Sequence, residues 1–220
     1  MTILLPGPIQ FPDTSRCNRD GLLAIGGDLS VPRLLLAYRS GIFPWTDEPI
    51  TWWSPHPRAI FDLQTYQPPR RLADKMKKRP FELTFDRDFA SVIQNCSKPA
   101  PGRETTWISP AFIDAYTALH RAGHAHSVEV WKEGKLVGGV YGVCIGGFFA
   151  GESMFHRETD ASKIALTHLL FRLRDAGFQL FDTQVLSPLT ERLGAFEIPR
   201  SDYLQRLAAA TALRVEFPRE

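Results

Sequence analysis

The stretch from Val137 to Gln184 constrains the fold more than any other part of the chain. It begins with apolar, β-branched and aromatic residues broken by glycine pairs, VGGVYGVCIGGFFAGESMF, which predicts two buried strands with a tight connection. Asp160, as a cap, then precedes apolar residues at helical spacing up to Gly177, which predicts an amphipathic helix. The last segment, FQLFDTQV, predicts a further strand. A hairpin followed by a helix and a strand indicates a mixed α/β sheet backed by helices.

Three polar side chains lie in or at the ends of these apolar strands. Glu152 stands in GESMF near the end of the second strand. Asp182 and Gln184 are two residues apart in the last strand, so both side chains are expected to leave the same face. A buried carboxylate is costly unless it is paired or used in chemistry. We therefore take Glu152, Asp182 and Gln184 as candidate catalytic residues.

Composition limits the class of protein. The 220 residues include 44% hydrophobic side chains and 15 Phe, which allow a sizeable core and exclude a disordered chain. No apolar run is long enough to span a membrane, and the N-terminus lacks the basic and apolar regions of a signal peptide. The three scattered cysteines fit neither a disulfide framework nor a zinc motif. We expect a soluble cytoplasmic protein.

The chain is predicted to form two domains. Residues 1–60 are dense in Pro, Gly and Trp and predict a small N-terminal domain, with residues 61–220 forming a larger one. The hairpin, helix and strand of the larger domain are similar to those of GNAT-type acyltransferases, which is an analogy of fold only. A GNAT enzyme that uses acetyl-CoA needs a glycine-rich turn at the helix start. Here that turn reads RETDASK, without glycine and with two acidic residues, which argues against CoA.

Charge and aromatic residues leave two readings open. The net charge is only +2, but residues 70–79, RRLADKMKKR, carry six basic side chains against one acidic. Such a run is either a solvated helix face or a patch that contacts phosphates. The tryptophans Trp45, Trp52, Trp53 and Trp107 either pack in the core or offer surfaces on which a nucleobase stacks.

Other kinds of chemistry have less support in the sequence. His124 and His126 alternate as strand residues do, but no third ligand is near in the sequence, so a hydrogen-bonded structural pair is favoured over a metal site. No G-x-S-x-G motif occurs, and Cys144 lies in an apolar run where a thiol is usually inert. A carboxylate beside an amide can instead orient an amine that attacks an activated ester, without a covalent intermediate.

Short sequence blocks spread from Gly21 to Leu207 together resemble the leucyl/phenylalanyl-tRNA–protein transferase family. These blocks are GLLAIGGDLS, GIFPW, WWSPHPRAIF, TWIS, GHAHSVEVW, GGVYGV, GESMF, DASK, FDTQ and LGAFEIPRSDYL. The resemblance implies an aminoacyltransferase that moves Leu or Phe, and also Met, from aminoacyl-tRNA to the N-terminal Arg or Lys of an acceptor protein. The new peptide bond would create an N-end-rule degradation signal. The resemblance further implies a cytoplasmic monomer with a GNAT-like catalytic domain and no metal or cofactor.

The resemblance also suggests roles for individual residues. Asp182 and Gln184 would handle the attacking α-amine, and Glu152 would lie in the pocket for the donor amino acid. Trp45 and Trp107 would contact the 3′-terminal adenosine. The apolar cavity for the donor side chain would be completed by Val140, Met154, Leu166, Leu169 and Phe181. The tRNA phosphates would be contacted by Arg70, Arg71, Lys75 and Lys78.

Two further expectations depend on this resemblance. The N-terminal cation of the acceptor needs an acidic partner, for which Glu158 and Asp160 are candidates. Val140 stands where a larger Met is expected, so the pocket is predicted to be wider and to shift toward Phe, which the variant Val140→Met tests. Two alternatives remain open from the residues alone: a GNAT-type amine acetyltransferase and a non-enzymatic tRNA-binding module.

Overall fold

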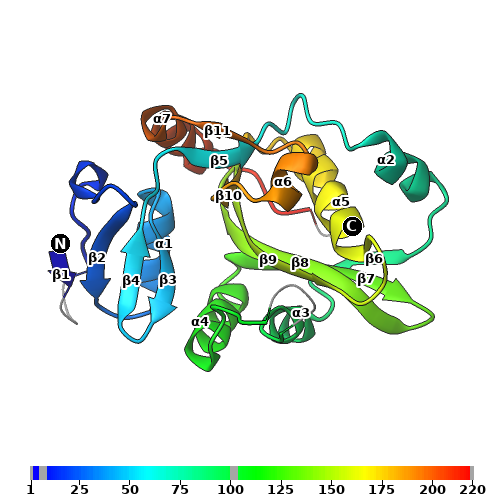
Figure 1. Ribbon diagram of the computed structural model, residues 1–220, viewed down its shortest axis with the longest axis horizontal. Coiled ribbons are helices and arrows are strands. Elements are labelled where there is room, and N and C mark those ends of the chain that lie inside the picture. Colours follow the sequence, from blue (N-terminus) through cyan, green and yellow to red (C-terminus); the bar gives the residue numbers. More distant parts are fainter. Residues whose placement is uncertain (1, 5–8, 100–103, 219–220) are drawn as a thin grey trace.

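The chain folds into two sheets flanked by helices (Figure 1). The computed structural model describes residues 2–4, 9–99 and 104–218. The smaller sheet has the strand order β1-β2-β4-β3 and carries the helix α1. Its elements are β1 (Thr2–Leu4), the short 3-10 helix η1 (Thr14–Arg16), β2 (Leu22–Gly26), α1 (Val31–Arg39), β3 (Phe43–Asp47) and β4 (Ile50–Trp53).

The larger sheet has seven strands in the order β11-β5-β10-β9-β8-β7-β6. All neighbours in this sheet are antiparallel except β10 and β9, which are parallel. The strands are β5 (Arg58–Phe61), β6 (Glu82–Phe85), β7 (Ala125–Lys132), β8 (Lys135–Ile145), β9 (Phe148–His156), β10 (Leu180–Gln184) and β11 (Phe196–Ile198). The predicted hairpin is β8–β9, and β10 is the strand predicted after the helix.

Helices cover both faces of the larger sheet. The helix α5 (Ala161–Asp175) packs on one face, and α3 (Phe89–Cys96) and α4 (Pro110–Arg121) pack on the other (Figure 1). The remaining helices are α2 (Arg70–Lys77), α6 (Pro188–Arg192) and α7 (Arg200–Thr211). The predicted mixed α/β architecture, with a small N-terminal part and a sheet flanked by helices, is confirmed. Among the described residues, no helix is both long and apolar enough to cross a membrane.

The chain passes from the smaller to the larger sheet between Trp53 and Arg58. One apolar core continues from the smaller sheet to the face of the larger sheet covered by α3 and α4. A second core lies on the face covered by α5. The division into two domains at residue 60 stays a prediction, while β5 itself pairs within the larger sheet.

Two local details explain features of the central stretch. Gly142 lies where β8 and β9 shift register, and a Cβ there would be 2.1 Å from the backbone oxygen of Ala150, so no other residue fits. Asp160 precedes α5 as predicted, but its backbone is left-handed with a φ of 68° and its side chain makes no capping hydrogen bond. Its carboxylate binds Lys75 and Lys163 instead, so Asp160 occupies the predicted N-cap position but does not cap the helix through its side chain.

Candidate active site

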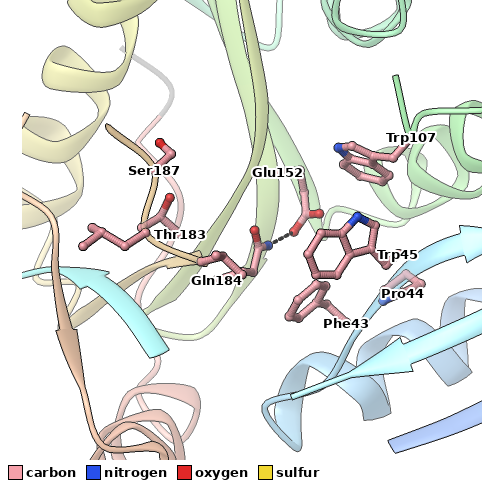
Figure 2. A pocket seen from close by; sticks show the side chains of 10 residues that line it. Phe43, Pro44, Trp45, Trp107, Glu152, Thr183, Gln184 and Ser187 are labelled. Atoms are coloured by element: carbon pink, nitrogen blue, oxygen red, sulfur yellow. Dashed lines mark hydrogen bonds between the residues drawn. The ribbon is translucent and has the colours of Figure 1, made fainter. Parts of the chain in front are cut away.

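A cavity of about 240 Å³ lies where the smaller sheet meets the larger one. It is lined by Phe43, Pro44, Trp45, Trp107, Glu152, Thr183, Gln184, Val185, Leu186 and Ser187. Figure 2 shows Glu152 between Gln184 on one side and Trp45 and Trp107 on the other. Four separate parts of the chain thus supply the lining: β3, the middle of β9, the end of β10 with the segment after it, and the segment before α4. Apolar walls with a few convergent polar groups are typical of ligand sites.

Glu152 is the acidic group that lines this cavity. One carboxylate oxygen, Oε2, accepts a hydrogen bond from the hydroxyl of Tyr116 at 3.1 Å. The other, Oε1, accepts from the side-chain amide of Gln184 at 2.9 Å. Burial raises the pKa of Glu152 to about 7, although the hydroxyl groups of Tyr38 and Tyr116 act to lower it. A carboxyl group that titrates near neutral pH inside a cavity is a candidate for chemistry.

Gln184 is placed by an irregularity in β10. The pairing of β10 with β5 shifts between Asp182 and Gln184, and Gln184 has a left-handed backbone with a φ of 58°. Its backbone N–H donates to Oδ1 of Asp182 at 2.8 Å. The bulge interrupts the alternation from which we predicted a shared face. Gln184 therefore lines the cavity while Asp182 lies behind it, fully buried.

Asp182 forms a buried ion pair with Arg58. The Nε and one terminal nitrogen of Arg58 donate to its two oxygens at 2.9 and 2.6 Å, and the hydroxyl of Tyr203 donates at 2.9 Å. Burial acts to lower the pKa of Arg58, but Asp182 and then Tyr203 raise it above its ordinary value. With the N–H of Gln184 included, the Asp182 carboxylate accepts hydrogen bonds from four donors, and the last of these fixes the backbone of Gln184.

Arg58 is a site residue that was not predicted from the sequence. Its guanidinium is 1% exposed, donates to the backbone oxygen of Gly41 at 3.2 Å, and lies over the rings of Phe43 and Tyr203 at 4.9 and 4.5 Å. The available signal was an arginine inside the apolar run RAIF, since a charge in a buried strand requires a partner. Nothing in the local sequence indicates which carboxylate that partner is.

The structure brings both predicted adenosine-binding tryptophans to the cavity. Trp45 is 39% exposed and packs edge-on against Trp53 at 5.2 Å between ring centres. Trp107 packs edge-on against Phe112 and Tyr116 at 5.1 and 6.3 Å. By contrast, Trp52 is fully buried and belongs to the core.

The apolar residues predicted for the donor pocket lie elsewhere. Four of them are at least 96% buried in the core beneath α5: Val140, Leu166, Leu169 and Phe181. Met154 is half-buried, pairs with Val140 across β8 and β9, and packs against the same core. Besides the two tryptophans, the apolar side chains that line the cavity are those of Phe43, Pro44, Val185 and Leu186. A donor pocket formed by the five core residues stays a prediction.

The predicted tRNA-binding residues lie on and beside α2. Arg70, Arg71 and Lys78 are exposed, whereas Lys75 is half-buried and bonds the backbone oxygen of Thr159 and the carboxylate of Asp160. Arg71 also lines a second cavity, of about 490 Å³, together with Lys163 and Arg192.

Both acids proposed for the acceptor's cation are paired with lysines. Glu158 binds Lys132 at 3.1 Å, and Asp160 binds Lys163 and Lys75 at 2.7 and 3.0 Å. Hydrogen bonds first from Lys163 and then from Lys75 lower the pKa of Asp160. Neither acid belongs to the lining of the cavity, so the structure does not support that assignment.

A second polar cluster involves one of the two predicted histidines. His126 bonds Asp86 at 2.6 Å, and His120 from α4 lies 3.9 Å from the same carboxylate, whereas His124 lies just before β7 and outside the cluster. The predicted His124–His126 pair is therefore wrong. His120, His126 and Asp86 place possible ligand atoms within 4.8 Å of one another. His120 also bonds the Ala125 backbone oxygen at 2.8 Å, so the Nδ1 atoms of both histidines have protein partners.

Comparisons with known proteins agree along nearly the whole chain. Residues 60–208 match the model of the family described as leucyl/phenylalanyl-tRNA protein transferase, and residues 27–56 match the N-terminal domain of the same description. Relatives named leucyl/phenylalanyl-tRNA–protein transferase include one from Syntrophobacter fumaroxidans, 52% identical over 90% of this chain and 86% of that protein. Another, from Thiobacillus denitrificans, is 50% identical over 90% of this chain and 89% of that protein.

Similar solved structures are more distant. L-PGS from Bacillus licheniformis is 14% identical with a TM-score of 0.45 and covers 76% of this chain and 55% of that one. A GCN5-related glucosamine N-acetyltransferase region of a fungal multi-domain enzyme is 11% identical with a TM-score of 0.46. It covers 65% of this chain and 20% of that one.

Proposed function

The chain belongs to the leucyl/phenylalanyl-tRNA–protein transferase family, and from this premise we propose that it moves Leu, Phe or Met from aminoacyl-tRNA to an acceptor protein. The acceptor begins with Arg or Lys, and the product is an N-end-rule degradation signal made in the cytoplasm by a monomer. Family membership supports this aminoacyltransferase over the two alternatives, a GNAT-type amine acetyltransferase and a non-enzymatic tRNA-binding module.

The contact between Gln184 and Glu152 in the cavity carries the proposal. The neutral α-amine of the acceptor attacks the ester carbonyl of the aminoacyl-tRNA, a C–N bond forms, and the ester C–O bond breaks to release the 3′ end of the tRNA. The nitrogen loses one proton and the leaving tRNA oxygen gains one, so the products are a peptide bond and a free hydroxyl group. The NH2 group of the Gln184 side-chain amide donates a hydrogen bond to Glu152. The oxygen of the same amide is therefore available to accept a hydrogen bond from the attacking amine. A hydrogen-bond acceptor at that position holds the amine in line with the ester carbonyl, and this orientation lowers the activation barrier.

The buried carboxylate of Asp182 supports this arrangement from behind the cavity. It accepts from the backbone of Gln184 and is held by Arg58, so the amide is anchored at both its backbone and its side chain. In this proposal Asp182 is a positioning residue, and Gln184 and Glu152 are the groups nearest the reacting amine. Transfer of labelled leucine from charged tRNA to a peptide that begins with Arg tests the function as a whole.

Trp45 is proposed to stack on the terminal adenosine of the tRNA. Base stacking on an aromatic side chain contributes about 1–3 kcal/mol, so Trp45→Ala is expected to raise the KM for aminoacyl-tRNA about 5- to 150-fold. Steady-state transfer assays measure this. The matched control is Phe196→Ala, since Phe196 is 41% exposed on β11 and apart from the cavity lining. An unchanged KM in Trp45→Ala would contradict the stacking role.

The exposed cations of α2 are proposed to contact tRNA phosphates. Each phosphate contact makes the negative slope of log K against log salt concentration steeper by about 0.7–0.9. The double variant Arg71→Glu with Lys78→Glu is therefore expected to bind tRNA more weakly and to have a slope that is less steep by between about one and two. Lys75 is left unchanged because its reversal would also break its ion pair with Asp160. Lys135→Glu, an exposed residue at the start of β8, is the control. Equal slopes for the double variant and the wild type would rule out this surface.

A further inference from the structure

Four side chains form a continuous line of hydrogen bonds that ends in the cavity. The hydroxyl of Tyr38 lies 2.6 Å from that of Tyr116, which donates to Glu152 at 3.1 Å, and Glu152 accepts from Gln184 at 2.9 Å. Figure 2 shows the last of these links, between Glu152 and Gln184. Tyr38 belongs to α1 and Tyr116 to α4, and both are 0% exposed. The line therefore joins the helix beside the smaller sheet to the amide that faces the substrate.

Counting hydrogens gives the line a direction. A tyrosine hydroxyl has one hydrogen to donate, and an ionised carboxylate can only accept. Since Tyr116 gives its hydrogen to Glu152, the hydrogen of Tyr38 must point to the oxygen of Tyr116. The ionised Glu152 then requires an N–H from Gln184, and this turns the oxygen of that amide away from Glu152. If Glu152 were protonated, it could donate to the amide oxygen, and the amide could present N–H groups to the incoming amine.

We propose that Tyr38 and Tyr116 are positioning residues that hold Glu152 as a carboxylate and so fix the Gln184 amide with its oxygen toward the attacking amine. This inference rests on the proposed transfer reaction and adds to it the residues that set the orientation of the amide. Burial, followed by the charge of Glu152, raises the pKa of both phenols well above the usual value, so they stay protonated as donors.

The other groups around Glu152 oppose one another. Asp182 in β10 acts to raise the pKa of Glu152, and Arg58 in β5 acts to lower it. Tyr141 in β8 packs edge-on against Tyr116 at 5.7 Å between ring centres. Tyr116 donates directly to Glu152 and Tyr38 fixes the direction of the Tyr116 hydroxyl, so the two phenols favour the ionised form of Glu152 against the effect of burial. Removing either hydroxyl is therefore expected to favour the protonated acid.

The test is the pH dependence of leucine transfer in Tyr116→Phe and Tyr38→Phe, which keep the ring and remove only the hydroxyl. A hydrogen bond to a charged group is worth enough to move the acid limb of kcat/KM upward by about one pH unit in Tyr116→Phe. At pH values below the midpoint, kcat/KM of Tyr116→Phe would be about tenfold lower than that of the wild type, and at high pH it would recover toward the wild-type value. The shift in Tyr38→Phe is expected in the same direction. Tyr66→Phe, which loses a buried hydroxyl bonded to Thr167, is the control and should leave the profile unchanged.

A direct titration separates this inference from the transfer reaction itself. Infrared difference spectra follow the carboxylate band of Glu152 with pH, identified by its loss in Glu152→Gln. An upward shift of this titration midpoint in Tyr116→Phe supports the inference even if no leucine is transferred. The absence of leucine transfer would overturn the proposed function alone. The same midpoint in the wild type, Tyr116→Phe and Tyr38→Phe, or a lower rate with an unmoved pH profile, would overturn the inference.

Discussion

Replacing Asp182 with alanine is expected to lower the free energy of unfolding by about 3–5 kcal/mol, because Arg58 would remain as a buried charge without its counter-ion. Arg58 and Asp182 are 1% and 0% exposed and are joined by two hydrogen bonds. Urea denaturation of the variant and the wild type measures the difference. The urea concentration at the midpoint of unfolding is expected to fall. A loss of about 3–5 kcal/mol in the free energy of unfolding is large enough to unfold part of the protein at physiological temperature.

This loss of stability confounds any test of Asp182 by activity alone. The double variant Arg58→Met with Asp182→Leu removes both charges, and such exchanges of a buried ion pair are often neutral or stabilising. It is expected to recover stability but not transfer, because the N–H of Gln184 would still lack its acceptor. An Asp182→Ala protein as stable as the wild type would contradict the ion-pair account. Full transfer by the double variant would contradict the positioning role.

Transfer by the wild type is expected to rise with pH through about pH 7, and Glu152→Gln to lower kcat/KM about 100-fold at pH 8 and to leave only the rise that follows the acceptor's α-amine, whose pKa is about 8. The reason is that the ionised carboxylate orients the Gln184 amide, while an amide at position 152 can bind it in either orientation. The measurement is the pH profile of transfer, with Glu197→Gln, an exposed acid on β11, as control. A profile that is flat in the wild type would contradict this role for Glu152.

The same group is expected to influence stability in the opposite sense. Burial raises the pKa of Glu152 to about 7 in the folded protein, above the value of about 4.3 expected when unfolded. The stabilisation that comes from holding the neutral acid is thus fully present below about pH 4 and is lost as pH rises through 7. Glu152→Gln stays neutral, so at pH 8 it is expected to be more stable than the wild type by up to about 3 kcal/mol. Denaturation at pH 5 and pH 8 should show the difference growing with pH.

The elements near the centre of the chain follow from the sequence because periodicity reports local burial. The hairpin β8–β9, the helix α5 and the strand β10 all appear where apolar spacing predicts them. The backbone of Gln184 does not follow from that spacing, because a single bulge in the pairing with β5 changes the direction in which its side chain leaves. The sequence pattern contains no signal for a bulge formed against a distant strand.

The partners in the site could not be predicted for a related reason. Arg58 and Asp182 are 124 residues apart, and Tyr38 and Tyr116 are 78 apart, so only the folded topology brings them together. The apolar residues show the opposite difficulty. Val140 and Leu166 have the character expected of a ligand pocket, but core packing and ligand binding require the same side chains. Family resemblance suggested Glu152, Gln184, Trp45 and Trp107 as site residues, and these four share one cavity.

The measurement that tests the central proposal most directly is transfer of labelled leucine from charged Leu-tRNA to two peptides, one beginning with Arg and one with Ala. Label is expected on the Arg peptide and not on the Ala peptide, a result that would establish the donor, the acceptor rule and the formation of a peptide bond together. Label on neither peptide, while the protein still binds the tRNA, would contradict the transfer reaction and favour a non-enzymatic tRNA-binding protein.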